Sequence, residues 1–452
     1  MARLGFAIAL LAVAFCAPAQ QLSLNPQVKA IVSEISADRI ADTQQKLASF
    51  GTRNIYSSTI DSNRGIGAAR EWIASQLRSY SPKLQVAFDK HRLKGDPSQR
   101  LYKDVEIWNV VAILPGTSEP ERQVIISGHY DSIHMVYKQD ANGRRTLDSE
   151  ATIAAEAPGV TDDGSGTAAV MELARVMSQY QFRKTIVFIA FASEEYGLEG
   201  SSTYAEAAAT RHDQIEAVFN NDIIGSDVTA NGEMTNRYVN VYSEDPNDSP
   251  SRQVARYIQQ INARYQPGFE VNMVFRHDRF GRGGDHSPFN AFGFAAVRLT
   301  TPMENFSNQH TATDTFANTA PAYTALVAKA NASAIATLAL APKPPELRTP
   351  APQGGRSFGT PLGRGEGYDA AMNWHNEHPE ADLMGYTVVM RKTTSPTWEH
   401  EIFVGNVTNY TLPRVNIDEV VLGVKAIDKD GNESLVSAFV TPPYRQRKVE
   451  QY

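Results

Sequence analysis

Cysteine is nearly absent from this sequence of 452 residues, in which Cys16 is the single one. A lone thiol excludes a fold stapled by internal disulfides, and it excludes a zinc site built from several cysteines. Any metal site must therefore use histidine, aspartate and glutamate. Removal of an N-terminal leader would remove Cys16 as well, and with it any thiol nucleophile.

Basic stretches and long apolar runs are also scarce. The net charge is −7 and lysine and arginine form no basic stretch, which argues against nucleic acid as a partner. Beyond the N-terminal leader, no segment has the roughly 20 apolar residues that cross a bilayer, so we expect no membrane span.

The first residues have the pattern of a secretory signal peptide. Arg3 is followed by a short apolar run and then by an A-x-A sequence at 17–19. We expect residues 1–19 to be removed and the protein to be secreted or periplasmic. The alternative is a lipoprotein acylated at Cys16, which the bulky Phe15 before it disfavours.

Strands and helices alternate over most of the remaining chain. The apolar run TIVFIAFA at 185–192 is typical of a strand covered on both faces, and helical patterns occupy 166–180 and 322–340. This alternation predicts an α/β domain over residues 20–340, with a mostly parallel sheet sandwiched by helices. The polar segment 138–158 has little pattern, and we interpret it as a surface insertion.

The pattern changes after residue 340. A proline-rich linker at 341–346 is followed by short alternating segments without a helical period. They predict an all-β sandwich over residues 347–445, which resembles a fibronectin type III domain with Trp374 as its core tryptophan. We expect this domain to contact a cell surface, a polysaccharide or a protein, or to act as a spacer.

Five short motifs place acids and histidines at the ends of the apolar strands. They are SGHYDS at 127–132, GVTDDGSG at 159–166, ASEEYG at 192–197, NND at 220–222 and GDHSP at 284–288. Ligands of open α/β sheets collect at the carboxyl ends of the strands, so these motifs should meet in one crevice. Imidazole and carboxylate are ordinary zinc ligands, and two histidines with three carboxylates suit two ions that share one carboxylate.

The adjacent acids Glu194 and Glu195 should have different roles. Neighbouring side chains just past a strand point in different directions, so both cannot easily ligate one metal. We expect one of them to be a ligand and the other to remain a free base.

In these motifs the chain resembles the secreted di-zinc aminopeptidases of the bacterial leucine-aminopeptidase type, relatives of glutamate carboxypeptidase and the transferrin receptor. The resemblance covers residues 31–340 and keeps the family's motif order. It implies two zinc ions held by His129, Asp162, Glu195, Asp222 and His286, with Asp162 as the bridge. It also implies Glu194 as general base and Asp131 as the acid that supports the first histidine. In the alternative register, Asp163 is the bridge.

The resemblance implies an enzyme that removes residues from peptides with a free N-terminus. Glu194 would take a proton from the attacking water and return it to the departing amine. Alternatives of the same fold are a carboxypeptidase and a glutaminyl cyclase, which keeps one zinc. The non-enzyme alternative is an inert binding protein, which the retention of every ligand position disfavours.

Several further residues near the motifs are candidates for contacts with the substrate. Some relatives have a tyrosine before the last histidine; Asp285 stands there, so we assign no tyrosine. Arg282, in a glycine-rich loop, is expected to contact either substrate or solvent. His310, in HTATDT, resembles a late family motif at the pocket wall, and Glu304 with Asn305 is a candidate for holding the substrate amine.

Overall fold

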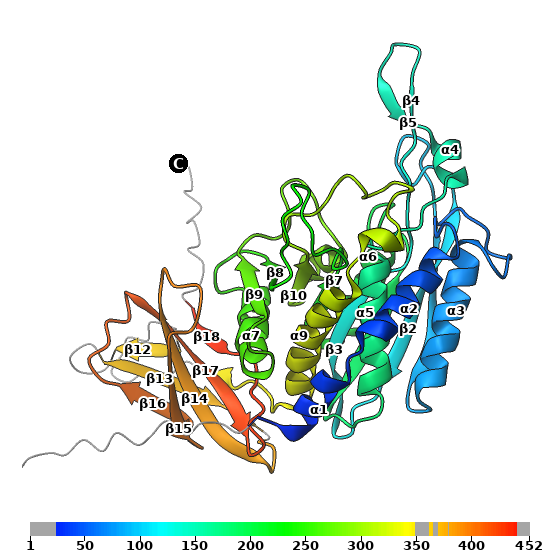
Figure 1. Ribbon diagram of the computed structural model, residues 1–452. Coiled ribbons are helices and arrows are strands. Elements are labelled where there is room, and N and C mark those ends of the chain that lie inside the picture. Colours follow the sequence, from blue (N-terminus) through cyan, green and yellow to red (C-terminus); the bar gives the residue numbers. More distant parts are fainter. Residues whose placement is uncertain (1–23, 349–360, 365–368, 378, 441–452) are drawn as a thin grey trace, which may run out of the picture.

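The computed structural model describes residues 24–348, 361–364, 369–377 and 379–440, so the expected signal peptide lies outside the described residues. Two units follow one another along the chain (Figure 1). The first is a mixed α/β unit that ends with the helix at 321–340, and the second contains antiparallel strands.

An eight-stranded sheet forms the centre of the first unit, in the order β1-β2-β6-β3-β7-β10-β8-β9. Its strands are β1 (Gln85–Leu93), β2 (Val105–Leu114), β3 (Glu119–His129), β6 (Lys184–Phe191), β7 (Gln214–Asn221), β8 (Tyr238–Ser243), β9 (Glu270–Val274) and β10 (Ala296–Thr300). The pairs β6–β3, β3–β7, β7–β10 and β8–β9 are parallel, and the other three pairs are antiparallel. The predicted mostly parallel sheet is confirmed.

Helices cover both faces of this sheet. One face carries α3 (Gly65–Tyr80), α5 (Gly164–Met177), α7 (Pro250–Tyr265) and α9 (Pro321–Leu340), with α1 (Pro26–Glu34) and α2 (Ala37–Ala48) packed on α5 and α9. The other face carries α6 (Glu199–Arg211) and α8 (His286–Ala291). Successive residues of β6 alternate between the two apolar cores, with Phe188 in one and Ile189 in the other. This alternation explains why the whole strand is apolar.

Helix α9 is long and apolar enough to cross a membrane by length and composition, and it is the one such helix among the described residues. However, 83% of its most apolar window is buried within the protein, as in the core helix of a globular domain. Pro321 occupies its first turn, where a missing N–H costs nothing.

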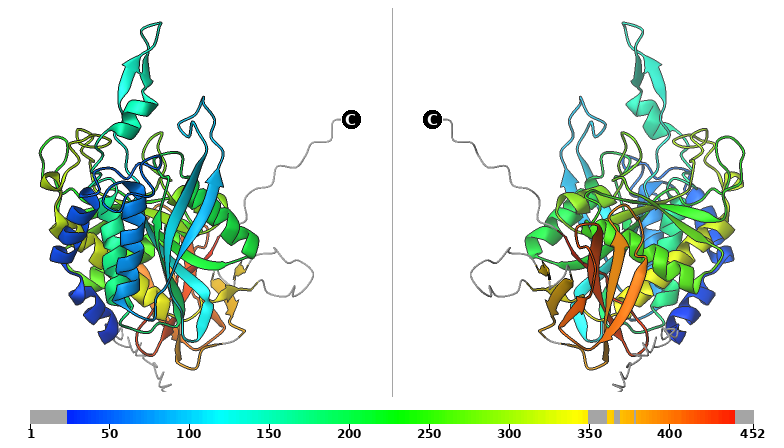
Figure 2. Two further views of the ribbon diagram at one scale, coloured as in Figure 1. Left: turned by 90° about the vertical axis from the view of Figure 1, so that its right-hand side faces the viewer. Right: turned by 90° about the vertical axis from the view of Figure 1, so that its left-hand side faces the viewer.

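The segment predicted as an insertion projects from the first unit (Figures 1 and 2). It contains a hairpin of β4 (Tyr137–Gln139) and β5 (Arg145–Leu147), followed by α4 (Ser149–Ala154). At the turn, the Asp140 carboxylate accepts the N–H groups of Asn142 and Arg144, both at 2.8 Å. The exposed position of β4 agrees with a surface insertion.

The second unit consists of two antiparallel sheets. One contains β11 (Glu346–Leu347), β12 (Leu362–Arg364), β13 (Ala370–His375) and β16 (Asn409–Leu412); the other contains β14 (Leu383–Lys392), β15 (His400–Gly405), β17 (Val420–Asp428) and β18 (Ser437–Phe439). Trp374 is buried between them, 5.7 Å from the ring of Tyr386. The antiparallel β class is confirmed, whereas the likeness to fibronectin type III stays a prediction.

Buried charges connect the two units through α7. Arg264 Nη1 lies 3.0 Å from Glu433 Oε2, and the Tyr257 hydroxyl donates to the Glu433 carbonyl oxygen at 2.8 Å. Glu433 is fully buried and also pairs with Lys425 at 3.0 Å. The Arg264–Glu433 pair crosses the boundary between the units, and it helps to compensate a buried carboxylate that would be strongly unfavourable without partners.

Candidate metal centre

Neighbouring parallel strands bring acids and a histidine to one edge of the sheet. His129 is the last residue of β3, Asp222 directly follows β7, and Glu194 comes three residues after the end of β6. These strands lie side by side in the order β6-β3-β7, so their carboxyl ends coincide. Asp162 reaches the same edge from the loop before α5.

Two groups of three side chains meet at Asp162 and share it. In one, His129 Nε2 lies 3.2 Å from Asp162 Oδ1 and 3.8 Å from Asp222 Oδ1. In the other, His310 Nε2 lies 3.1 Å from Asp162 Oδ2 and 3.1 Å from Glu195 Oε2. Ligands about 2.0–2.1 Å from one tetrahedral zinc lie about 3.3 Å apart, so each group has roughly the size of one coordination sphere.

His286 belongs to neither group, and the structure does not bring it to Asp162 as the sequence analysis expected. It is the first residue of α8 and is fully buried. Its Nε2 lies 3.0 Å from the carbonyl oxygen of His277 and 3.5 Å from Asp278 Oδ2. His310, from the loop after β10, lies beside Asp162 and Glu195, where His286 was expected to lie. Because α8 begins at the GDHSP motif and packs on the sheet, its histidine turns into the protein.

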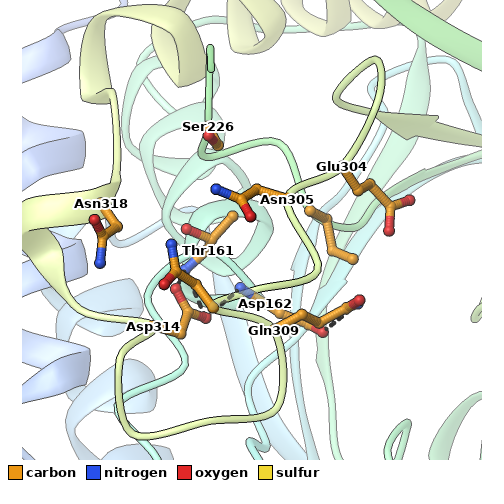
Figure 3. A pocket seen from close by; sticks show the side chains of 10 residues that line it. Thr161, Asp162, Ser226, Glu304, Asn305, Gln309, Asp314 and Asn318 are labelled. Carbon is orange, nitrogen blue, oxygen red and sulfur yellow. Dashed lines mark hydrogen bonds between the residues drawn. The ribbon is translucent and has the colours of Figure 1, made fainter. Parts of the chain in front are cut away.

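The segment around His310 is bound to the loop that carries Asp162 (Figure 3). Asp314 Oδ1 accepts the N–H of Thr161 at 2.9 Å, and its Oδ2 accepts the N–H of Asp162 at 3.0 Å. Gln309 Nε2 donates to Asp162 Oδ2 at 2.9 Å. The HTATDT motif therefore contributes both a candidate ligand and the residue that braces Asp162.

Asp163 has a different environment from Asp162. Its Oδ2 accepts the N–H of His129 at 3.0 Å, while its Oδ1 accepts the N–H groups of Gly166 at 2.8 Å and Ile223 at 3.2 Å. Both oxygens are engaged by backbone donors from three separate segments. This geometry favours Asp162 over Asp163 as the shared carboxylate.

Replacing Asp163 by alanine should lower the free energy of unfolding by at least about 3 kcal/mol. Three N–H groups in a buried region would lose their acceptor, at about 1–3 kcal/mol each. Urea denaturation of the metal-loaded protein measures the change. Asp163→Asn keeps one acceptor oxygen and should lose less. A loss below 1 kcal/mol for the alanine variant would contradict this bracing role.

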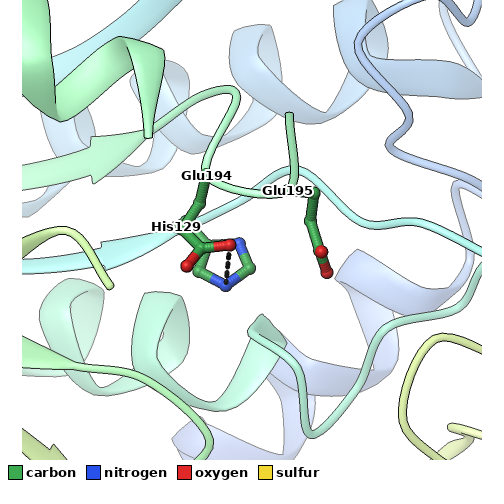
Figure 4. A group of neighbouring side chains, drawn as sticks. All are labelled: His129, Glu194 and Glu195. Carbon is green, nitrogen blue, oxygen red and sulfur yellow. Dashed lines mark ion pairs between the residues drawn. The ribbon is translucent and has the colours of Figure 1, made fainter. Parts of the chain in front are cut away.

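Glu194 and Glu195 have different nearest partners, although both also lie close enough to His129 to form a third group of candidate ligands. Glu194 Oε2 lies 4.0 Å from His129 Nε2 (Figure 4). Glu195 Oε2 lies 3.1 Å from His310 Nε2. Asp131 holds the turn between them: its Oδ1 accepts the N–H of Glu194 at 3.2 Å and its Oδ2 that of Glu195 at 3.3 Å. The Asp131 carbonyl oxygen lies 3.1 Å from Nδ1 of His129. Asp131 thus orients both the first histidine and the glutamate pair.

Strained backbone surrounds the same cluster. Ser193, Ile223 and His310 have positive φ angles of 70°, 60° and 56°. Each is a candidate ligand or precedes or follows a site residue. Such conformations cost non-glycine residues about 1–3 kcal/mol, and they concentrate at functional sites where the surrounding structure enforces them.

The cluster contains several buried carboxylates, and so much negative charge away from water is unfavourable without bound cations. Burial raises the pKa of Glu194 well above its ordinary range, and the charges of Asp222 and Glu195 raise it further. Burial alone would lower the pKa of His310, but Glu195 and Asp162 outweigh this effect and raise it to about 11. His129 Nε2 and Glu195 Oε1 are buried without a hydrogen-bond partner. Imidazole and carboxylate donors of this kind fit divalent zinc.

Zinc removal should lower the melting temperature, and the loss should grow with pH. Without cations, the pKa values of Glu194 and Glu195 in the folded protein exceed the ordinary 4.5, so the folded state binds more protons than the unfolded chain. Their contribution to stability is therefore lost as pH rises through the raised values. Each kcal/mol corresponds to about 2–4 °C in a domain of about 150–250 residues, and to less in a larger one. Scanning calorimetry of zinc-loaded and chelator-treated protein at about pH 5 and pH 8 measures both differences, and equal differences would contradict this account.

A buried arginine that the sequence analysis did not single out supports Asp222. Arg298, in β10, is fully buried, and its Nη2 lies 3.0 Å from Asp222 Oδ1. Its Nη1 donates to the carbonyl oxygen of Gly283 at 2.9 Å. The only signal in the sequence was an arginine inside the apolar run AAVRL, which is an unusual place for a charge.

Comparisons with known proteins agree with this architecture. The profile of peptidase family M28 matches residues 109–335, which is half of the chain. A protein from Pyrenophora teres f. teres, described as a probable zinc metalloprotease, is 33% identical over 441 residues, which cover 91% of this chain and 86% of that protein. The LapA aminopeptidase of Legionella pneumophila matches with a TM-score of 0.52 and 20% identity, over 71% of this chain and 76% of its own. LapB of the same organism matches with a TM-score of 0.53 and 19% identity, over 71% and 77%. These two structures share the fold.

Proposed function

Because the chain belongs to peptidase family M28, we propose that it is a zinc metalloprotease of the aminopeptidase type that holds two zinc ions. His129 and Asp222 would hold one ion, Glu195 and His310 the other, and Asp162 would bridge them. The observation that carries this proposal is the pair of ligand groups that share Asp162, with one of its oxygens toward each group.

Glu194 is the best-placed general base. Its carboxylate borders the cluster but belongs to neither of the two groups that share Asp162. Two zinc ions bound there would polarise the scissile carbonyl and make a water molecule more acidic. Glu194 would then accept the proton of the attacking water and deliver it to the departing amine. Asp131 keeps this carboxylate in position through the Glu194 N–H.

Secretion and the role of the second unit belong to the same proposal. The signal-peptide pattern at 1–19 supports export, followed by action on extracellular or periplasmic peptides. The antiparallel unit would contact a surface, a polysaccharide or a protein, or hold the catalytic unit away from such a surface.

A panel of aminoacyl 4-nitroanilides, assayed with zinc analysis, tests the function. We expect hydrolysis that a chelator abolishes and zinc restores, with two zinc ions per chain. N-acetylated anilides should not react, because an aminopeptidase needs a free amine. Release of residues from the C-terminus of N-blocked peptides would instead indicate a carboxypeptidase. One zinc per chain with cyclisation of N-terminal glutamine would indicate a glutaminyl cyclase.

A further inference from the structure

A cavity of about 300 Å³ opens beside the candidate metal centre, and three arginines line it. They are Arg100, Arg279 and Arg282, and they share the lining with acids of the centre, among them Asp162 and Glu194. In the proposed enzyme the zinc ions neutralise those acids. The arginines then determine the charge that an entering substrate meets.

Arg282 and Arg100 each have guanidinium N–H groups that can still donate hydrogen bonds to a ligand. Arg282 Nη1 lies 3.1 Å from Glu304 Oε2 and 3.4 Å from Gln309 Oε1. Its Nε and Nη2 have no hydrogen-bond partner among the described residues. Arg100 donates from Nη1 to the carbonyl oxygen of Glu195 at 2.7 Å, and no ion pair involves it in the described part of the chain. Both guanidinium groups can therefore accept an additional anionic partner.

The carboxylates closest to these arginines already form ion pairs with arginine side chains. Glu304 binds Arg279 Nη1 through both oxygens, at 2.8 and 2.9 Å, and also pairs with Arg282. Asp278 binds Arg279 Nε at 2.9 Å and lies 3.5 Å from Arg298. A carboxylate shared by two arginines is a poor site for a substrate amine, so Glu304 does not suit the amine-holding role considered from the sequence. Arg282 therefore shares its acidic partner with Arg279, and Arg100 has none among the described residues.

A second hollow at Asp162 offers much less room. It is lined by residues such as Asn305, Gln309 and Asn318, and its volume is about 20 Å³ (Figure 3). That volume admits about one water molecule. Of these two hollows, only the arginine-lined one has room for a substrate side chain or a second residue.

We propose that the arginine-lined cavity binds a carboxylate of the substrate through Arg282 and Arg100, so that preferred substrates carry a negative charge next to the scissile bond. This inference rests on the proposed function. Guanidinium groups bind carboxylates with paired, charge-assisted hydrogen bonds, which lysine does not reproduce. The carboxylate has two possible sources: the side chain of an acidic N-terminal residue, or the C-terminus of a short peptide.

Matched substrates separate these sources in the zinc-loaded full-length enzyme. Glutamyl and glutaminyl 4-nitroanilides differ only by the charge of the side chain, and a dipeptide differs from its C-terminal amide only by the terminal charge. We expect kcat/KM to favour the charged member of at least one pair by tenfold or more. Arg282→Gln should bring that ratio close to one, and Arg282→Lys should restore part of it. Arg276→Gln is the matched control, because Arg276 is an exposed arginine near the same loop that does not line the cavity.

Each possible result either supports or contradicts the proposed carboxylate binding. A preference in the anilide pair assigns the side-chain source, and a preference in the dipeptide pair assigns the C-terminal source. If leucyl anilide is hydrolysed but neither charged member is preferred, the carboxylate inference fails while the proposed function stands. If no substrate is hydrolysed, the proposed function fails, and calorimetric titration with glutamic acid α-amide and glutaminamide decides the inference. Tighter binding of the charged amide that is lost in Arg282→Gln would support it, and equal affinities would overturn it.

Discussion

Replacing Glu194 by glutamine is expected to lower kcat for aminoacyl anilides by about 10²–10⁴-fold while the zinc content stays unchanged. Glutamine keeps the size of the side chain but cannot accept the proton of the attacking water. In the proposed arrangement Glu194 is not a ligand, because it lies outside the two groups that share Asp162; it forms only the third group, with His129 and Glu195. Neither proposed ion should therefore lose a ligand. Steady-state kinetics together with metal analysis of the same preparation measures both quantities.

Glu199→Gln provides the matched control for this variant. Glu199 lies in the first turn of α6, five residues along the chain, and it does not line the cavity at the metal centre. We expect this variant to keep nearly normal turnover. If Glu194→Gln retained more than a tenth of the activity at full zinc content, Glu194 would not be the base. If it lost zinc instead, Glu194 would be a ligand.

Replacing His310 by glutamine is expected to weaken zinc binding at one of the two positions by at least about 100-fold. Residues that merely support metal ligands already contribute about 10–100-fold to affinity, so the loss of a ligand should cost more. His310 Nε2 lies 3.1 Å from both Asp162 Oδ2 and Glu195 Oε2, whereas His129 approaches Asp162 at its other oxygen, Oδ1. Turnover should fall with the loss of this ion. Competitive titration against a zinc chelator measures the affinity without any need for activity.

The matched variant is His286→Gln. His286 contacts the backbone of His277 and the carboxylate of Asp278, and it lies in neither ligand group. We expect this variant to bind two zinc ions with unchanged affinity, although loss of a buried ring should lower its melting temperature. The opposite pattern, in which His286→Gln loses zinc and His310→Gln keeps it, would restore the assignment made from the sequence.

The strand-end motifs were predictable because their chemistry is local. An entirely apolar strand such as β6 needs cover on both faces, and the residues that follow it must emerge at the edge of the sheet. For this reason the sequence alone predicts that His129, Asp222 and the glutamate pair lie together. The order of the motifs also predicts Asp162 as the bridging carboxylate. The three backbone N–H groups that occupy Asp163 favour this assignment over Asp163.

The last histidine was not predictable in the same way. Both GDHSP and HTATDT combine a histidine with an acid. GDHSP was expected at a strand end, but in the structure α8 begins within it, and HTATDT follows β10 only after a loop. Only the packing distinguishes them, since α8 turns His286 inward while Asp314 binds the Thr161–Asp162 backbone and brings His310 to the centre. The arginines of the cavity are equally non-local. Arg100 and Arg282 are far apart in the sequence and become neighbours of one cavity through the fold.

The buried ion cluster at Glu433 has a consequence for how this protein can be divided. Lys425 and Glu433 belong to the strand unit, but Arg264 and Tyr257 of α7 complete their environment, and Leu435 packs against the apolar core of the first unit. The two units therefore cannot be exchanged like independent modules. If either unit were grafted onto another protein, the new partner would have to replace these contacts between the units.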